Sequence, residues 1–201
     1  NPNGQQDPNY RYSIPGYMKY HDKDGVNDIT PADKEIIGSA IPKVTMGMTN
    51  TFRYKNVSLS VFLNAQLGQT ANNWLYDVSH NSYRQNRLMV DFWTPENPTG
   101  NFPRPTTNGA LEMGSIARQD ASYVRLQNIT IGYTLPKNLT QRFFVEKLRV
   151  YVSGQNLWTS TNYSGYNPEV NARPSNSLSP GEDYGTYPLA KTFLFGLNIT
   201  L

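Results

Sequence analysis

Four carboxylates lie close together in the stretch HDKDGVNDITPAD, residues 21–33. They stand at the first, third, seventh and twelfth positions of a twelve-residue loop and belong to Asp22, Asp24, Asp28 and Asp33. Oxygen ligands at such positions converge on Ca²⁺ in calcium-binding loops. Val26 occupies the fifth position, where a carboxylate is usual, and Asp33 is shorter than the closing Glu of such loops. The spacing therefore predicts a degenerate calcium loop, with Ca²⁺ as the candidate cofactor.

The same stretch also fits an acidic turn that opens a short helix. Thr30 suits the N-cap, Pro31 suits the first helical position, and Asp33 can complete a capping box. Gly38 would then end the helix. Both interpretations remain open at the level of the sequence.

Catalytic chemistry finds little support in this chain. It has no cysteine, and its two histidines, His21 and His80, do not have a metal-ligand spacing. No nucleophile elbow, P-loop or dinucleotide-binding motif is present in the sequence. The formal charge is +3, but Lys and Arg are scattered singly, which argues against nucleic-acid binding. We therefore expect neither an enzyme nor a nucleic-acid partner.

Aromatic side chains in the polar stretches are the candidates for direct ligand contact. Rings of this kind can stack on a sugar or a peptide, although loop tyrosines also pack on one another. The candidates are Trp93, Tyr163, Tyr166 and Tyr187.

The elements that would position these groups are five segments in which apolar and polar side chains alternate, which is typical of β-strands. They form a hairpin at 43–67, a strand pair at 122–158 and a final strand at 191–201. A change of phase near Gln127 and Asn128 predicts a β-bulge. Each segment has about 10–14 residues, longer than usual globular strands and long enough to cross a membrane.

The connections alternate in length. Lys55 and Asn56 predict a tight turn within the hairpin, whereas residues 1–42, 68–121 and 159–190 are long and polar. Short turns on one side and long loops on the other are typical of outer-membrane barrels. The sequence therefore predicts an all-β, antiparallel transmembrane β-barrel, with apolar strand faces toward lipid, long loops outside the cell and a periplasmic C-terminus.

Particular stretches carry a family resemblance. They are PGYMKYHDKDGVNDITPADKEIIG, IPKVTMGMTNTFRYKNVSLSVFLNAQLG, FWTPENPTGNFPR, DASYVRLQNITIGYTLP, LRVYVSGQNLWT, YSGYNPEV and GTYPLAKTFLFGLNITL. In this order they resemble the C-terminal part of SusC/RagA-family TonB-linked outer-membrane transporters. The resemblance implies that the five segments are the last strands of a 22-stranded barrel around a plug. It also implies a barrel-assembly signal at Gly196, Ile199 and Leu201, although such chains usually close on an aromatic residue and this one closes on Leu201.

The resemblance implies import of nutrient oligosaccharides or peptides across the bacterial outer membrane. The implied partners are a SusD-like surface lipoprotein, TonB acting through an N-terminal region absent here, the rest of the barrel and plug, and outer-membrane lipid. One alternative is a soluble β-sandwich that binds carbohydrate or mediates adhesion. Another is a SusC-like structural subunit of a larger outer-membrane complex without transport activity.

Overall fold

The computed structural model describes residues 15–16, 20–26, 29–76, 91–104, 115–172, 175–176 and 178–201 of the 201-residue chain. The chain divides into two compact units, each of which is described by itself. The first consists of Asn1–Gly38 and Trp74–Ala117, and the second of Ser39–Asn73 and Arg118–Leu201. No helix among the described residues is both long and apolar enough to cross a membrane.

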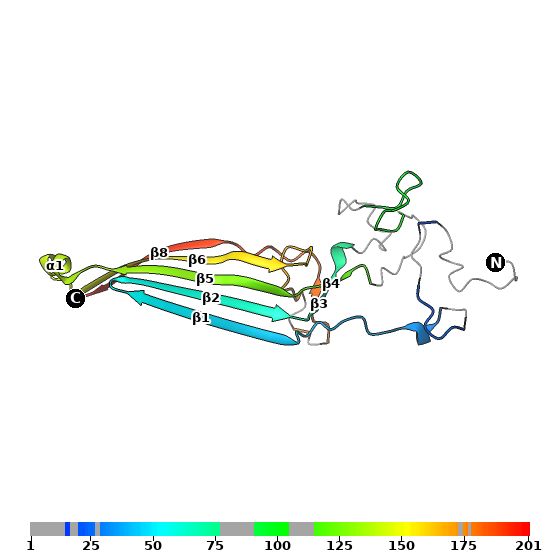
Figure 1. The fold of residues 1–201 in the computed structure, drawn as a ribbon, viewed down its shortest axis with the longest axis horizontal. Coiled ribbons are helices and arrows are strands. Elements are labelled where there is room, and N and C mark those ends of the chain that lie inside the picture. The colour runs from blue at the N-terminus through cyan, green and yellow to red at the C-terminus, as the bar shows by residue number, and fades with distance from the viewer. Residues whose placement is uncertain are drawn as a thin grey trace. The chain divides into compact units, whose positions relative to one another are not determined.

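The second unit is built on one antiparallel sheet of five long strands in the order β1-β2-β5-β6-β8 (Figure 1). The strands are β1 (Val44–Tyr54), β2 (Val57–Leu67), β5 (Tyr123–Thr134), β6 (Lys147–Thr161) and β8 (Thr192–Thr200). Each strand pairs with its neighbour in an antiparallel register. The predicted all-β, antiparallel architecture and its five long strands are therefore confirmed.

The short connections lie at one end of this sheet, which we call the turn end. Lys55 and Asn56 join β1 to β2, and Lys55 has a left-handed φ of 50°, as a two-residue hairpin turn requires. The link from β5 to β6 contains α1 (Lys137–Thr140) and a 3-10 turn at Gln141–Phe143. Figure 1 shows both connections and the C-terminus at the same end. The long loops leave from the opposite end, which we call the loop end, as the alternation in connection length predicts.

The bulge in β5 is also confirmed. The register with β2 passes from Leu63↔Leu126 to Phe62↔Asn128, which leaves Gln127 without an opposite residue. The pairing of β5 with β6 shifts at the same place. The extra residue keeps the apolar side chains on both sides of the bulge on one face of the sheet.

The long loops contain short strands that the sequence did not indicate. β3 (Thr70–Asn73), β4 (Arg118–Asp120) and β7 (Glu182–Asp183) form a second sheet in the order β4-β3-β7. Elements of two to four residues are too short to show a period of two, so the sequence did not reveal them within the long segments 68–121 and 159–190. β6 also continues to Thr161, beyond its predicted end at residue 158.

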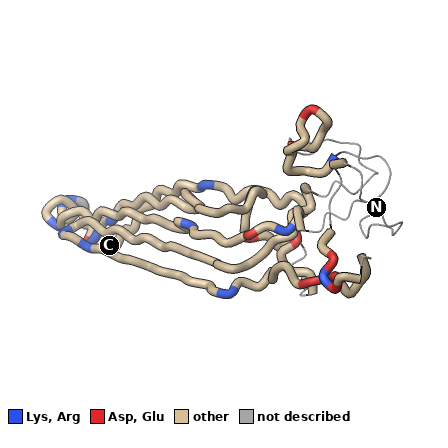
Figure 2. The backbone as a smooth tube through the Cα atoms, turned by 45° about the vertical axis from the view of Figure 1, so that its right-hand side comes forward, with Lys and Arg blue, Asp and Glu red and all other residues tan. Residues whose placement is uncertain are grey.

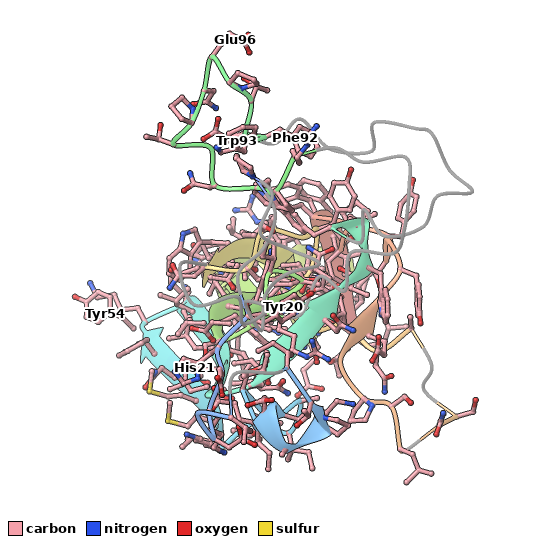
Figure 3. The ribbon with its side chains drawn as sticks, turned by 90° about the vertical axis from the view of Figure 1, so that its right-hand side faces the viewer. Tyr20, His21, Tyr54, Phe92, Trp93 and Glu96 are labelled. Carbon is pink, nitrogen blue, oxygen red and sulfur yellow. The ribbon has the colours of Figure 1, made fainter. Side chains whose placement is uncertain are left out.

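In the first unit, the predicted capping motif at Thr30 and Asp33 is present. Thr30 caps a 3-10 helix at Pro31–Asp33, and Asp33 completes the capping box. The helix ends at Asp33 because Lys34 is already extended, so the predicted end at Gly38 was wrong. Within the segment 91–104, the Trp93 amide donates to the Phe102 carbonyl at 2.8 Å. Figure 3 shows Phe92 and Trp93 close together on this segment and Glu96 at its tip.

Candidate functional site: the two faces of the sheet and its loop end

One face of the five-stranded sheet is apolar along its whole length and remains exposed. Its exposed side chains include Val44, Met46, Met48, Phe52, Tyr54, Val57, Ile131, Tyr133, Val152, Trp158, Phe193, Phe195, Leu197 and Ile199. The Phe195 side chain, for example, is 80% exposed. Exposed apolar surface costs about 25 cal/mol per Å² in water, so a continuous band of this kind requires an apolar medium. Lipid supplies one and leaves the opposite face to line an aqueous interior.

The opposite face carries a hydrogen-bonded network of small polar side chains across β5 and β6. The Asn128 amide donates to Ser153 Oγ at 3.0 Å, and the hydroxyls of Ser153 and Thr130 lie 2.8 Å apart. On β2, Ser58 Oγ accepts a hydrogen bond from the Arg149 guanidinium at 3.0 Å. These groups satisfy one another along the strands, as expected of a wall that faces water.

Two large side chains lie flat on this wall because glycines make room for them. A Cβ added at Gly196 would overlap the Tyr151 ring, and one at Gly132 would overlap the Arg149 guanidinium. The Arg149 guanidinium in turn lies 5.6 Å from the centre of the Tyr151 ring. Gly196, predicted as part of an assembly signal, therefore also has a local packing role.

At the loop end of the sheet, Arg125 fastens the loop after β6 to the strands. Its side chain is 3% exposed and forms a 2.8 Å ion pair with Glu169. The same guanidinium donates to Asn167 Oδ1 at 2.8 Å and to Thr159 Oγ1 at 3.1 Å. Because the guanidinium is buried and its partners come from strand and loop, the loop position is fixed by a charge-assisted cluster.

Asp183 organises the last part of that loop. It is 1% exposed, and its carboxylate accepts hydrogen bonds from the Tyr163 hydroxyl at 2.6 Å and from the Gly185 and Thr186 amides. Burial alone would raise the pKa of Asp183, but the hydrogen bonds from Thr186, Tyr163 and Gly185 outweigh this effect and lower the pKa below its usual value. The carboxylate is therefore held in its charged form.

A hollow of about 220 Å³ opens at the loop end within the second unit. Its lining combines Gln66, Gln69, Thr70, Glu169 and Asn171 with small residues that include Gly181. Amide, hydroxyl and carboxylate groups of this kind can exchange hydrogen bonds with a hydroxylated or peptidic ligand.

The acidic turn brings three of its four predicted ligands together. Carboxylate oxygens of Asp22, Asp24 and Asp33 lie within 4.8 Å of one another. Asp33 accepts backbone hydrogen bonds from Lys23 and Thr30, which lower its pKa. The capped turn and the converging carboxylates thus coexist, and bound Ca²⁺ stays a prediction. Asp28 and His80 lie outside the described residues.

The aromatic candidates have different surroundings. Tyr163 is buried against Asp183, which argues against a direct ligand contact. Tyr166 and Tyr187 are exposed at 69% and 89% and remain ligand candidates. Trp93 lies in the first unit, where its ring packs on Gly16.

The clusters around Arg125 and Asp183 were not predicted from the sequence. The partners of Arg125 lie 34 to 44 residues further along the chain, so no local motif could reveal them. The one available signal was an arginine inside an alternating strand, where a charge requires a partner.

Comparison with known proteins agrees with this geometry. The sequence matches no family model. It is 38% identical over 192 residues to TonB-dependent receptor P3 of Formosa agariphila, covering 93% of this chain and 19% of that protein. It is 32% identical over 189 residues to TonB-dependent receptor SusC of Bacteroides thetaiotaomicron, covering 89% of this chain and 17% of that protein. The chain thus spans less than a fifth of the length of these two relatives.

Solved structures share the fold. The chain aligns with the RagAB peptide importer in its "open-open" state with a TM-score of 0.68 and 21% identity, covering 87% of this chain and 19% of that chain. With the "closed-closed" state the TM-score is 0.67 and the sequence identity is 22%, and the alignment covers 88% of this chain and 20% of that chain. These proteins are named as receptors or importers and not as enzymes, in agreement with the sequence-based expectation. The chain belongs to the SusC/RagA family of TonB-dependent outer-membrane receptors.

Proposed function

We propose that the chain supplies five neighbouring strands and the outer loops of a barrel that imports oligosaccharides or peptides across the outer membrane with energy delivered by TonB. The observation that carries this proposal is the combination of an exposed apolar face and a hydrogen-bonded polar face on one sheet. Similarity to TonB-dependent receptors over most of the chain supports it.

In this proposal the loop end faces the outside of the cell and the turn end faces the periplasm. The polar wall around Ser58, Thr130 and Ser153 then borders the path of the substrate. Exposed rings at Tyr166 and Tyr187 and the hollow beside Glu169 are the groups in this chain that would meet a sugar or peptide from outside.

We also propose a SusD-like lipoprotein as the partner on the loop end, and Ca²⁺ as an ion held by the acidic turn. Long, Tyr-rich loops suit a lid that docks from outside the cell. The Arg125 and Asp183 clusters give the loop between β6 and β8 a fixed shape for such docking. The convergence of three carboxylates supports the calcium proposal. TonB and the plug would act through parts of the protein outside this chain.

A growth experiment tests the import function. A strain that lacks the complete receptor gene should lose growth on one defined oligosaccharide or peptide mixture while growing normally on monosaccharides and amino acids. Restoring the intact gene should restore growth, whereas a gene without its TonB-interaction segment should not. Equal growth of all strains on every such substrate would oppose import and favour a structural subunit.

Purification tests the partner. The complete receptor, extracted in mild detergent, should retain a surface lipoprotein in constant proportion. A variant with Arg125→Gln loses the ion pair that holds the loop between β6 and β8 and should release the lipoprotein more readily. Recovery of the receptor alone in repeated preparations would contradict the partner proposal.

The soluble sandwich is not supported by the structure. In the second unit the long strands form one sheet, and their apolar face is exposed over its length instead of packing on a second layer. A sandwich buries such a face in a core between two sheets.

A further inference from the structure

The charges on the five-stranded sheet are distributed unevenly between its two ends. Residues 43–67, 121–161 and 191–201 contain nine Lys and Arg residues and one acidic residue, Glu146. Cations gather around the turn end, and Figure 2 shows a group of blue segments close to the C-terminus. They are Arg53, Lys55, Lys137, Arg142, Lys147 and Arg149. The turn end is therefore a concentrated positive surface.

One of these cations, Lys55, borders the apolar face. Lys55 Nζ lies 5.4 Å from the centre of the Tyr54 ring, and Tyr54 is the last apolar-face residue of β1. Figure 3 shows Tyr54 projecting away from the body of the sheet. Tyrosine and lysine at the end of a lipid-facing strand are typical of the level of lipid headgroups. The positive surface thus begins where the apolar band stops.

Phe144 adds an apolar group to the same end. It follows the short helical turn between β5 and β6, has a left-handed φ of 56°, and is 92% exposed. A bulky residue in this conformation costs free energy, and Gly or Asn would fit the turn better. The exposed ring has no packing role that would offset this cost within the described residues. Insertion between lipid acyl chains would bury it.

We propose that the turn end, formed by Lys55, Lys137, Arg142, Phe144 and Lys147, binds the headgroup of an anionic phospholipid in the periplasmic leaflet. The cations would contact the phosphate, and the Phe144 ring would enter the acyl region beside it. The proposal rests on the membrane location and orientation given under Proposed function. An acidic protein would match the charge, but it would not require an exposed ring at the border of a lipid-facing band.

Glu146 allows a test in which removal of a charge should strengthen lipid binding and not weaken it. It is exposed and stands next to Lys147 at the start of β6. Its carboxylate repels a phosphate group, so removal of its charge should strengthen binding of an anionic lipid. A purely structural role of the cations predicts no such gain.

The experiment titrates phosphatidylglycerol into the complete receptor in detergent and counts bound lipid by native mass spectrometry. Phosphatidylcholine serves as the uncharged comparison. The test variant is Lys137→Gln with Arg142→Gln, and its matched control is Lys43→Gln with Lys191→Gln, which removes two exposed cations at the loop end. Each cation near an anionic surface changes binding by a factor of about five. We expect about 25-fold weaker phosphatidylglycerol binding in the test variant and less than two-fold change in the control.

Two further variants separate the roles. Glu146→Gln should bind phosphatidylglycerol about five-fold more tightly. Phe144→Asn fits the left-handed turn and should bind the lipid about ten-fold more weakly through loss of the buried ring. Equal binding of phosphatidylglycerol and phosphatidylcholine, or an unchanged affinity in the test variant, would overturn the proposal.

The membrane location is checked separately in the same preparations. A folded outer-membrane barrel resists detergent at low temperature and migrates differently on a gel before and after heating. Receptor that shows this shift but no preference for phosphatidylglycerol contradicts the lipid site alone. Receptor without the shift contradicts the proposed function as well.

Discussion

At the scale of single residues, the acidic turn combines two tasks that mutation can separate. Asp33 accepts hydrogen bonds from two backbone amides and therefore stabilises the turn with or without metal. Asp24 Oδ1 accepts the Val26 amide at 3.1 Å, and an Asn at this position can accept the same bond without the charge. The two residues thus allow loss of turn structure to be distinguished from loss of a calcium ligand.

We predict that Asp24→Asn weakens Ca²⁺ binding by the complete receptor by about ten-fold or more, because affinity in such loops follows the number of charged ligands. Isothermal titration calorimetry after treatment with a chelator measures this affinity. Thr30→Ala is the control, since it removes the cap hydroxyl and keeps all three carboxylates. Equal affinities of the wild type and Asp24→Asn, or no binding by either, would oppose a calcium site.

The Asp183 cluster should make the outer loop sensitive to acid. Burial would raise the pKa of Asp183, but its hydrogen bonds lower that pKa below its usual value. Its stabilising contribution is therefore complete above the usual pKa of an aspartate and is lost as the pH falls through the lowered pKa. We predict that the Gly185 and Thr186 amides are equally protected from hydrogen exchange at pH 7 and pH 5, after correction for the intrinsic rate, and lose protection only when the pH falls below the usual pKa of an aspartate. Tyr163→Phe should reduce their protection at neutral pH by about 1–3 kcal/mol. Unchanged protection in this variant would mean that the hydroxyl is dispensable.

Contacts between residues close in the chain are the ones that the sequence predicts at this scale. Thr30 and Asp33 are three residues apart, so the capping box follows from spacing alone. Tyr163 and Asp183 meet across 20 residues of loop whose path is not periodic. The sequence predicted Tyr163 as a ligand contact because this pairing leaves no local pattern. In the structure its hydroxyl donates a hydrogen bond to the buried Asp183 carboxylate.

At the scale of elements, the glycines of the polar face differ in what a side chain would meet. A Cβ at Gly196 would overlap the Tyr151 ring, whereas one at Gly47 would lie 3.4 Å from the Phe62 ring, an ordinary contact. We predict that Gly196→Ala lowers the stability of the complete barrel by about 1–3 kcal/mol, as overpacking does, and that Gly47→Ala changes it by less than about 0.5 kcal/mol. Urea unfolding in lipid vesicles measures both. Equal effects of the two substitutions would contradict the packing role of Gly196.

The bulge at Gln127 sets the faces of β5. Its deletion would shift Val124, Arg125 and Leu126 by one position, so that Arg125 would face lipid and both apolar side chains would face the polar interior. We predict that this deletion prevents barrel assembly in the outer membrane, measured as loss of heat-dependent gel migration. Gln127→Ala keeps the extra residue and should assemble normally. Normal assembly of the deletion variant would show that the register can adjust elsewhere.

The strands were predictable to the extent that they are long. Over ten or more residues, as in β1 and β2, alternation specifies both the strand and its two faces, and the bulge appears as a change of phase. β7 has two residues and pairs in parallel with β3, more than a hundred residues earlier in the chain. Its position depends on tertiary contacts and leaves no pattern in the sequence.

At the scale of the whole molecule, the long strands in the second unit form an open sheet. Among the described residues, β1 and β8 are its two end strands, each paired on one side. Their outer backbone groups need partners, and in lipid each unsatisfied group costs several kcal/mol. Closure therefore requires strands beyond these five, in agreement with relatives more than five times as long as the matched segment.

We predict that residues 1–201, produced alone in buffer, do not form a monodisperse monomer, because both sheet edges and the apolar face would meet water. Size-exclusion chromatography with light scattering should show aggregates, and detergent should disperse them without producing heat-dependent gel migration. The complete receptor in the same detergent should show that migration and serves as the control. A folded, monodisperse monomer of residues 1–201 in buffer, with its apolar face protected from hydrogen exchange, would contradict the membrane assignment of this sheet and favour a two-layer soluble fold.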